Sequence, residues 1–323
     1  MIAINRFKFN NYSSVDFDLI TDLCFEGGDN GETSTFLQKE ANSSERYDGT
    51  FHNVTRYKYN ETLNPTIMLI KQGFGDFSME ENRRILAWLT SKHTASWLTV
   101  YHDDSEVVSY ELLGGFSSVE AYKLGNGRIV GYICQWESVS PYAYSPIKTI
   151  TQTITSPTVM NIKCNTDEWE APVYPKITIK QSNDTVVNIT SAMASTIFNN
   201  DNYIDGTVYH CDGTYYWKAV DDNGQIVSYT NTTNDSGLQT TSVMLYNETA
   251  NVKTYIKGNT ANETIIIDGA NRVVSTENDS RSVLGNDFAW EWLPLMYGDN
   301  KIRIVGNCEI TLMWREPIKP GDY

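Results

Sequence analysis

The chain has 323 residues, of which 40% are hydrophobic and 12% aromatic, and its formal net charge at pH 7 is −15. This composition is typical of a globular protein and excludes an intrinsically disordered chain. The acidic excess argues against a protein that holds nucleic acid, because phosphate binding needs clustered Lys and Arg. The same charge would suit the acidic lining of a channel through which DNA passes without binding. It would equally suit a protein whose charge only keeps it soluble, and composition does not distinguish the two. The length predicts two domains.

Neither a targeting segment nor a membrane span is expected. Asn5 and Arg6 interrupt the apolar residues of the N-terminus, so no signal-peptide core forms and we expect folding in the cytoplasm. The longest apolar run, near Ile67–Ile70, is far shorter than the roughly 20 residues that cross a bilayer. No Cys-x-x-Cys pair occurs, which favours buried free thiols over a zinc site or a disulfide framework. The five cysteines are Cys24, Cys134, Cys164, Cys211 and Cys308.

The N-terminal part is predicted to be mainly β. Apolar residues alternate with polar ones over Val15–Leu19 and Arg56–Tyr59, which is the pattern of half-buried strands. Thr66–Lys71 shows no such alternation and is predicted to be a central strand covered on both sides. The segment Gly27–Gly49, rich in Gly, Asn and Ser, is predicted to be a long loop, and such loops are usually functional.

One helix is predicted over Ser78–Lys92. Ser78 and Glu81 have the spacing of a capping box, in which each side chain accepts a backbone N–H at the helix start. Ile85, Trp88 and Leu89 fall at i, i+3 and i+4 and form the apolar face of the helix. The other side of the helix leaves Glu81, Arg83 and Arg84 available to water or a partner.

Strands are predicted to follow the helix. Trp97–Asp104 and Val107–Gly115 read as strands, and Gly125–Gly127 predicts a turn before a strand over Arg128–Trp136. Beyond Ser138 the periodicity disappears, which predicts a linker over residues 141–157.

The second half is predicted to be a β-sandwich, because turn signals separate many short β-rich runs. Asp212-Gly213 and Asn223-Gly224 outline a three-strand meander, which we interpret as an insertion at about residues 195–240. Its aromatic residues could stack on sugar rings or could pack the small core of the insertion. These residues, the candidate glycan-binding set, are Tyr209, Tyr215, Tyr216 and Trp217.

No catalytic, cofactor or metal site is predicted. The acidic pairs Asp103/Asp104, Asp167/Glu168 and Asp221/Asp222 are chain neighbours, and such pairs do not face one another as glycoside hydrolysis requires. The four histidines share no ligand spacing, and no nucleophile elbow or phosphate-binding loop occurs.

Two segments resemble the distal tail proteins of long-tailed siphophages. The first covers Glu81–Phe116 and Gly127–Pro146, and the second covers Thr264–Pro317. The matching positions of the first are Arg83 or Arg84, Ile85, Trp88, Leu89, Asp103, Asp104, Tyr110, Pro141 and Tyr142. Those of the second are Asp268, Gly269, Pro294, Gly298, Asn300, Trp314 and Arg315. The resemblance does not extend to roughly Thr185–Tyr246.

The resemblance implies a structural virion protein of the tail tip, assembled in the host cytoplasm, that is not an enzyme. In this family the N-terminal domains form a hexameric ring that joins the tail tube protein to the tail-tip hub protein and the receptor-binding apparatus. DNA passes through the lumen without specific binding. Each protomer of a ring needs two different faces. The candidate faces are the loop Gly27–Gly49 and the helix residues Glu81, Arg83 and Arg84.

The predicted architecture is therefore mainly β. It comprises an N-terminal β-sandwich-like domain with one α-helix over residues 1–140, the linker 141–157, and a galectin-like sandwich over residues 158–323 that carries the insertion. The alternative function is a carbohydrate-binding module that attaches to host glycans. A glycoside hydrolase is disfavoured, because no separated pair of carboxylates is evident.

Overall fold

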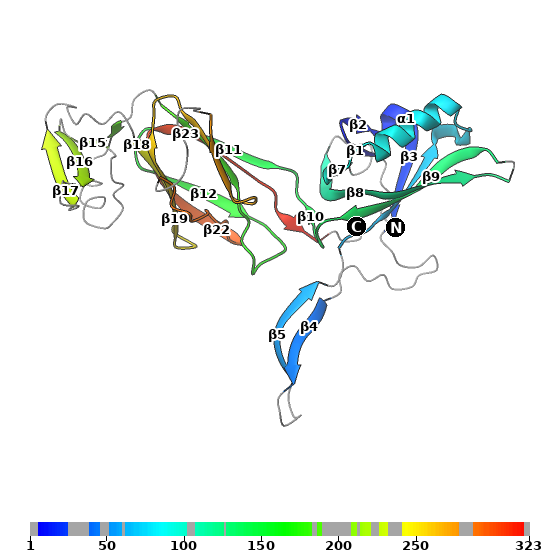
Figure 1. Cartoon of the computed structure of the whole chain (residues 1–323), viewed down its shortest axis with the longest axis horizontal. Coiled ribbons are helices and arrows are strands. Elements are labelled where there is room, and N and C mark those ends of the chain that lie inside the picture. Colours follow the sequence, from blue (N-terminus) through cyan, green and yellow to red (C-terminus); the bar gives the residue numbers. More distant parts are fainter. Residues whose placement is uncertain are drawn as a thin grey trace. The chain divides into compact units, whose positions relative to one another are not determined.

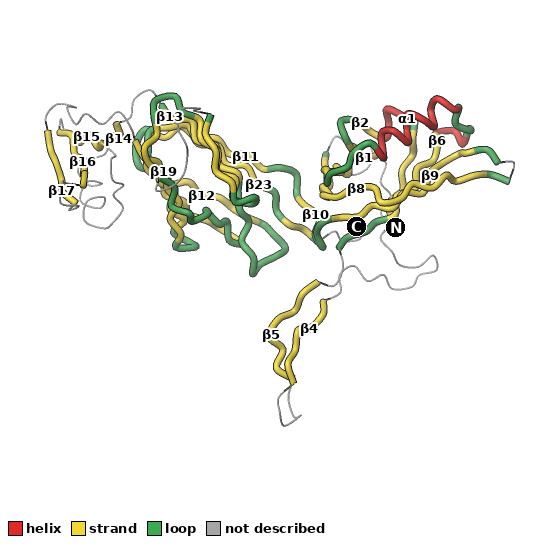
Figure 2. Tube along the Cα trace, in the orientation of Figure 1, coloured by secondary structure: helices red, strands yellow, loops and turns green. Residues whose placement is uncertain are grey.

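The computed structural model divides the chain into two compact units. Unit 1 consists of Met1–Pro146 and Pro317–Tyr323, and unit 2 consists of Ile147–Glu316. The structure describes residues 6–24, 39–45, 52–59, 62–101, 107–125, 127–182, 186–188, 208–211, 214–220, 226–231, 241–277 and 287–319. Within these ranges the regular structure is almost entirely β-strand, with one α-helix (Figures 1 and 2). The predicted mainly β class is confirmed.

Unit 1 is built on a nine-stranded antiparallel sheet. Seven strands follow the order β2-β1-β7-β8-β9-β6-β3, and β10 joins the sheet through β8 and pairs with β24. Their bounds are β1 Arg6–Phe9, β2 Tyr12–Ser13, β3 Leu19–Cys24, β6 Thr66–Lys71, β7 Ser96–Tyr101, β8 Val108–Lys123, β9 Ile129–Ser138, β10 Ala143–Tyr144 and β24 Pro317–Ile318. The other sheet among the described strands of unit 1 is the antiparallel pair β4 (Lys39–Glu45) and β5 (His52–Tyr59), so a sandwich-like second layer remains a prediction.

The single α-helix of the described residues, α1 (Met79–Thr90), lies along the main sheet of unit 1 (Figure 1). Its buried side chains Ile85, Trp88 and Leu89 belong to the same apolar cluster as Phe7, Leu98 and Leu112 of the strands. The predicted helix, its capping box and its buried face are confirmed. The hairpin predicted at Gly125–Gly127 is confirmed as well, because β8 pairs with β9 on either side of it.

Three predictions in unit 1 are wrong. Ser14–Phe17 forms a 3-10 helix, η1, with its own Ser13–Asp16 capping box, so local side-chain bonding prevails over the alternating pattern. β6 is a central strand as predicted, paired with β9 and β3, but only its Ile67 and Leu69 side chains are buried, so the expected cover on both faces is wrong. The expected loop Gly27–Gly49 contains strand β4, whose pairing with β5 was not visible in a segment of Asn, Ser and charged residues.

Unit 2 contains two antiparallel sheets whose apolar side chains form one buried cluster, as expected for a β-sandwich. The first sheet has the order β11-β23-β13-β20-β21 and the second the order β12-β22-β18-β19. The bounds are β11 Lys148–Ile154, β12 Thr158–Cys164, β13 Lys176–Gln181, β18 Thr241–Asn247, β19 Val252–Asn259, β20 Thr264–Asp268, β21 Val273–Thr276, β22 Gly298–Val305 and β23 Cys308–Trp314.

A third sheet of unit 2 corresponds to the predicted meander. β15 (Val208–Cys211), β16 (Thr214–Val220) and β17 (Ile226–Asn231) pair antiparallel in sequence order, which confirms the two predicted hairpins. A short strand, β14 (Val186–Asn188), adds to β15 in parallel. The division of the chain near residue 140 remains a prediction. In the sequence, the first compact unit ends at Pro146 and the second begins at Ile147. The predicted linker, residues 141–157, includes strands β10 and β11.

Candidate interaction surfaces

The position of α1 is fixed by a stack of rings beneath it. The indole of Trp88 lies between the ring of Phe7, 5.3 Å away, and the ring of Phe17, 4.6 Å away, both nearly parallel to it. Its Nε1–H donates a 2.8 Å hydrogen bond to the backbone oxygen of Phe9. The guanidinium of Arg84 lies 5.8 Å from the centroid of Phe17 and closes the stack. Arg84 therefore contributes to packing within the protomer.

The first turn of α1 is also held from within. Glu81 accepts the backbone N–H of Ser78, while its own N–H donates to the Ser78 hydroxyl. Lys71 lies 2.8 Å from Glu81 and also donates to the backbone oxygen of Asp76. The hydrogen bond from Lys71, followed by the one from the Ser78 backbone, lowers the pKa of Glu81 to about 2. The predicted interface residue Glu81 is thus a structural cap and half of an ion pair.

A stripe of side chains on α1 remains exposed. Met79, Arg83 and Leu86 follow one another at i, i+4 and i+7, which places them on one face of the helix. Met79 is 89% exposed and Leu86 40% exposed, and Arg83 is also exposed. We call these three residues the helix stripe. Phe74, 74% exposed, precedes it in the 3-10 turn η2 (Gln72–Phe74). Exposed apolar side chains of this size make the helix stripe a candidate contact surface.

The sequence analysis missed the apolar members of the helix stripe, although the heptad-like spacing of Met79 and Leu86 could have shown them.

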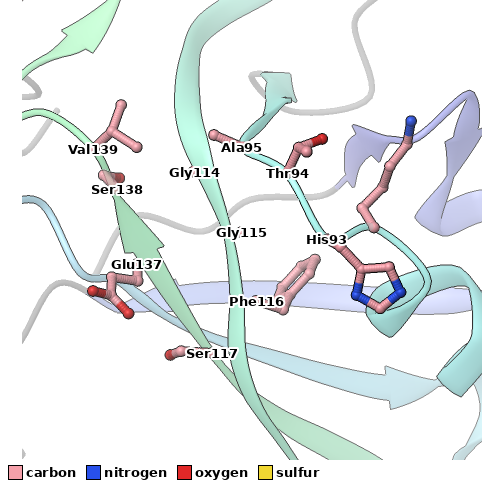
Figure 3. A pocket seen from close by; sticks show the side chains of 11 residues that line it. His93, Thr94, Ala95, Gly114, Gly115, Phe116, Ser117, Glu137, Ser138 and Val139 are labelled. Atoms are coloured by element: carbon pink, nitrogen blue, oxygen red, sulfur yellow. The ribbon is translucent and has the colours of Figure 1, made fainter.

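A cleft of about 380 Å³ lies at the end of α1 (Figure 3). One side is the loop Lys92–Ala95 that follows the helix, and the other side is formed by Gly114–Ser117 of β8 and Glu137–Val139 at the end of β9. Phe116 points into the cleft, as Figure 3 shows, and its ring packs against Trp136, 5.1 Å away. The cleft combines an aromatic surface with Lys92, His93 and Glu137, and it has the size of a pocket for a side chain or a turn of a partner.

Gly114 makes this part of the sheet possible. A Cβ at Gly114 would lie 2.1 Å from the backbone oxygen of Glu137, so a side chain there would push β8 and β9 apart. At the neighbouring Gly115, by contrast, a Cβ would meet no atom within 4 Å.

The other predicted site residues are placed as follows. Tyr209 lies opposite Tyr216, and His210 opposite Tyr215, in the paired strands β15 and β16, and Trp217 lies in β16. The structure describes the backbone of these strands and not their side chains, so the glycan-binding prediction remains a prediction. The acidic pairs Asp103/Asp104 and Asp221/Asp222 lie outside the described residues.

The side chains of three of the five cysteines are described, those of Cys134, Cys164 and Cys308, and their thiols are free and buried, as predicted. Burial raises the pKa of Cys134 and Cys308 to about 12 and that of Cys164 to about 11. Among the residues that the structure describes, no cluster of His, Cys, Asp and Glu could hold a metal ion. In the same part of the chain no helix is long and apolar enough to cross a membrane.

Comparison with protein families gives matches for both halves of the chain. Residues 2–140 match a phage tail protein N-terminal domain, and residues 215–314 match a phage tail C-terminal domain. The chain belongs to the phage tail proteins. As a tail component it is part of the virion, in agreement with the family predicted from the sequence. The C-terminal match begins at Tyr215, inside the segment that we interpret as an insertion.

The fold extends the likeness to a phage tail protein over the whole chain. The crystal structure of SPP1 Dit (gp 19.1), titled a paradigm of the hub adsorption apparatus in phages infecting Gram-positive bacteria, matches with a TM-score of 0.51 and 12% identity. The match covers 97% of this chain and 98% of SPP1 Dit. Two structures of the phage P2 baseplate in its activated conformation, with Ca and with Sr, match over the same shares at 10% identity and a TM-score of 0.44. No curated protein sequence matches this chain.

Proposed function

We propose that this phage tail protein is a structural adaptor of the tail tip, in which six copies of unit 1 form a ring between the tail tube and the tail-tip hub. The observation that carries the proposal is the tail-protein domain match over residues 2–140, and the fold shared with SPP1 Dit supports it. The ring passes DNA without binding it specifically, and unit 2 is a galectin-like sandwich. Catalysis has no part in this function.

The helix stripe is one of the two faces that a cyclic ring requires. Met79 and Leu86 offer apolar surface, and Arg83 offers a positive charge on a chain whose formal net charge is −15. Copies with such a charge repel one another, so a ring is favoured where an exposed cation of one protomer meets acidic residues of the next. The cleft next to α1 is the candidate for the second face, because it is concave and holds Glu137.

Negative-stain electron microscopy and light scattering of the purified chain at micromolar concentration test the ring. We expect six-fold rings with a central pore. Arg83→Glu and Leu86→Glu should each give smaller particles, while Lys180→Glu, a charge reversal at an exposed site of unit 2, should leave the rings intact. Raising the salt from about 0.1 to 1 M shortens the screening length from about 10 to 3 Å and should weaken the wild-type ring. A strictly monomeric wild-type chain would refute the proposal.

A second candidate function is attachment to host glycans through the meander β15–β17. The pairing of Tyr209 with Tyr216, next to Trp217, supports it, because aromatic residues on a small sheet can stack on sugar rings. Loss of glycan binding on Trp217→Ala, with ring formation unchanged, would support this candidate. Glycan binding that is equal in the wild type and the variant would rule it out.

A further inference from the structure

Unit 2 displays a pair of exposed aromatic rings far from the meander in sequence. Trp169 is 67% exposed and Tyr297 is 51% exposed, and their ring centroids lie 5.3 Å apart with planes inclined by 33°. Two large rings in contact with each other and still open to water are unusual for a surface without a partner. We call Trp169 and Tyr297 the aromatic pair.

The antiparallel pairing of β12 with β22 brings the two residues together, because the end of β12 lies beside the start of β22. Cys164, the last residue of β12, pairs with Gly298, the first residue of β22. The segment that follows β12 and the segment that precedes β22 therefore start side by side, with Trp169 on the first and Tyr297 on the second. A bridge between Val173 and Leu295, with hydrogen bonds of 2.9 and 2.7 Å, joins the two segments again.

Buried polar groups hold both segments rigidly. The side chain of Asn300, 1% exposed, accepts the backbone N–H of Met296 and donates to the backbone oxygens of Met296 and Gly298. These bonds fix the turn that carries Tyr297, in which Gly298 has a φ of 90°. On the other segment, the fully buried Thr166 accepts the N–H of Glu168 through its hydroxyl. The rings are thus presented in a fixed place, which lowers the entropy that binding would cost.

The surroundings of the aromatic pair decide the kind of ligand. Glu168 and Glu170 flank Trp169 in the chain, and Asp299 follows Tyr297 by two residues and lies opposite Lys163 in the paired strands. A protein interface of ordinary size needs about 800 Å² on each side and few charged residues at its centre. This apolar surface consists of two rings, and three acidic residues lie within two positions of them in the chain. A pyranose ring fits it better, because one face is apolar and its edge carries hydroxyls that donate to carboxylates. Elsewhere in unit 2, the rings of Tyr174 and Trp292 are covered by Arg272, at 3.8 and 5.4 Å from the ring centroids.

We propose that the aromatic pair Trp169–Tyr297 is a saccharide-binding site that stacks on an uncharged pyranose, with the neighbouring carboxylates accepting hydrogen bonds from its hydroxyls. The negative charge of these carboxylates excludes anionic saccharides such as uronic acids and phosphorylated polyols. The site depends neither on ring formation nor on the meander.

Saturation-transfer difference NMR of the full chain tests the proposal, because it detects weak ligands, with a Kd on the order of 1 mM, on large proteins. The probes are neutral oligosaccharides of glucose, galactose, mannose and N-acetylglucosamine, with oligogalacturonate as the anionic comparator. We expect signal from at least one neutral probe and none from oligogalacturonate. Trp169→Ala and Tyr297→Ala should each weaken the binding at least tenfold, and Trp169→Phe should retain part of it.

A matched variant controls the experiment. Trp290→Ala removes another exposed tryptophan of unit 2. It should change the binding less than twofold. The proposal is overturned if no neutral probe binds, if the double variant of the aromatic pair still binds, or if Trp169→Ala abolishes association with another tail protein while no saccharide binds. Particle size measured on the same samples reports ring formation separately.

Discussion

Trp88 joins α1 to the sheet of unit 1, so its replacement tests how the helix stripe is held in place. Trp88→Phe keeps a ring between Phe7 and Phe17 but removes the N–H that donates to the Phe9 oxygen. Trp88→Ala removes the ring as well. The side chain is 4% exposed, so water cannot readily replace what either variant loses.

The expected magnitudes follow from this geometry. A buried acceptor that loses its donor costs about 1–3 kcal/mol, whereas truncation of a core tryptophan to Ala costs about 3–5 kcal/mol. For a domain of about 150 residues, 1 kcal/mol corresponds to roughly 2–4 °C in Tm. We therefore expect Trp88→Phe to lower the Tm by roughly 2–12 °C and Trp88→Ala by roughly 6–20 °C.

Calorimetry of the full chain measures these shifts, and hydrogen exchange of peptides from β1 and α1 locates them in unit 1. Trp169→Ala is the matched control, because this tryptophan is 67% exposed and lies in unit 2. Its effect should remain within about 0.5 kcal/mol. If Trp88→Phe lowers the Tm no more than Trp169→Ala does, the stack and its hydrogen bond do not hold α1, and the reasoning is refuted.

Three further predictions concern single groups. The pKa of Glu81 is lowered from 4.5 to about 2 on folding, so its stabilisation is present above pH 4.5 and lost as the pH falls toward 2. Because the carboxylate is partly exposed, the contribution is small. Glu81→Gln should reduce the loss of unfolding free energy between pH 4.5 and pH 2 by only about 0.5 kcal/mol. Gly114→Ala should cost about 1–3 kcal/mol in urea unfolding, while Gly115→Ala, with space for its Cβ, should be nearly neutral. Cys134 and Cys308 should resist alkylation by iodoacetamide at pH 8 until the chain unfolds, as mass spectrometry of peptides can show.

The sequence predicted best what is decided locally. The start of α1 is set by Ser78 and Glu81, three residues apart, and its buried face by Ile85, Trp88 and Leu89. The hairpins of the meander are set by Asp-Gly and Asn-Gly turns, whose flanking strands pair as expected. Each of these elements needs no knowledge of distant residues, so pattern and turn chemistry were sufficient.

What depends on distant partners was predicted poorly. Val15–Phe17 alternates like a strand but forms a 3-10 turn, in which the Phe17 ring stacks on the distant Trp88 of α1. Thr66–Lys71 is apolar like a strand covered on both faces, but only Ile67 and Leu69 are buried, and the side chains of the opposite face are half-exposed. The aromatic pair was invisible, because the contact of Trp169 with Tyr297 follows from the register of β12 with β22.

The positions that carry the family resemblance are mostly part of the scaffold. Trp88 fixes α1, Asn300 fixes the turn before β22, and a Cβ at Gly269 would lie 2.8 Å from the backbone oxygen of Pro175. Substituting such residues disturbs the fold and does not act directly on a contact with a partner. The resemblance therefore identifies the architecture of a tail protein without identifying what each surface binds.

Partner choice must then reside in exposed residues that the scaffold leaves free to vary. The helix stripe and the aromatic pair both have this character: each consists of large exposed side chains set on a rigidly bonded element. A rigid element with an exposed apolar tip loses little conformational freedom on binding, so even a small contact can be specific. Such contacts are weak singly, and six copies in one ring would engage a surface together with far higher avidity than one copy could. On this argument the ring proposed for unit 1 and the saccharide site proposed for unit 2 reinforce each other, although each is tested separately.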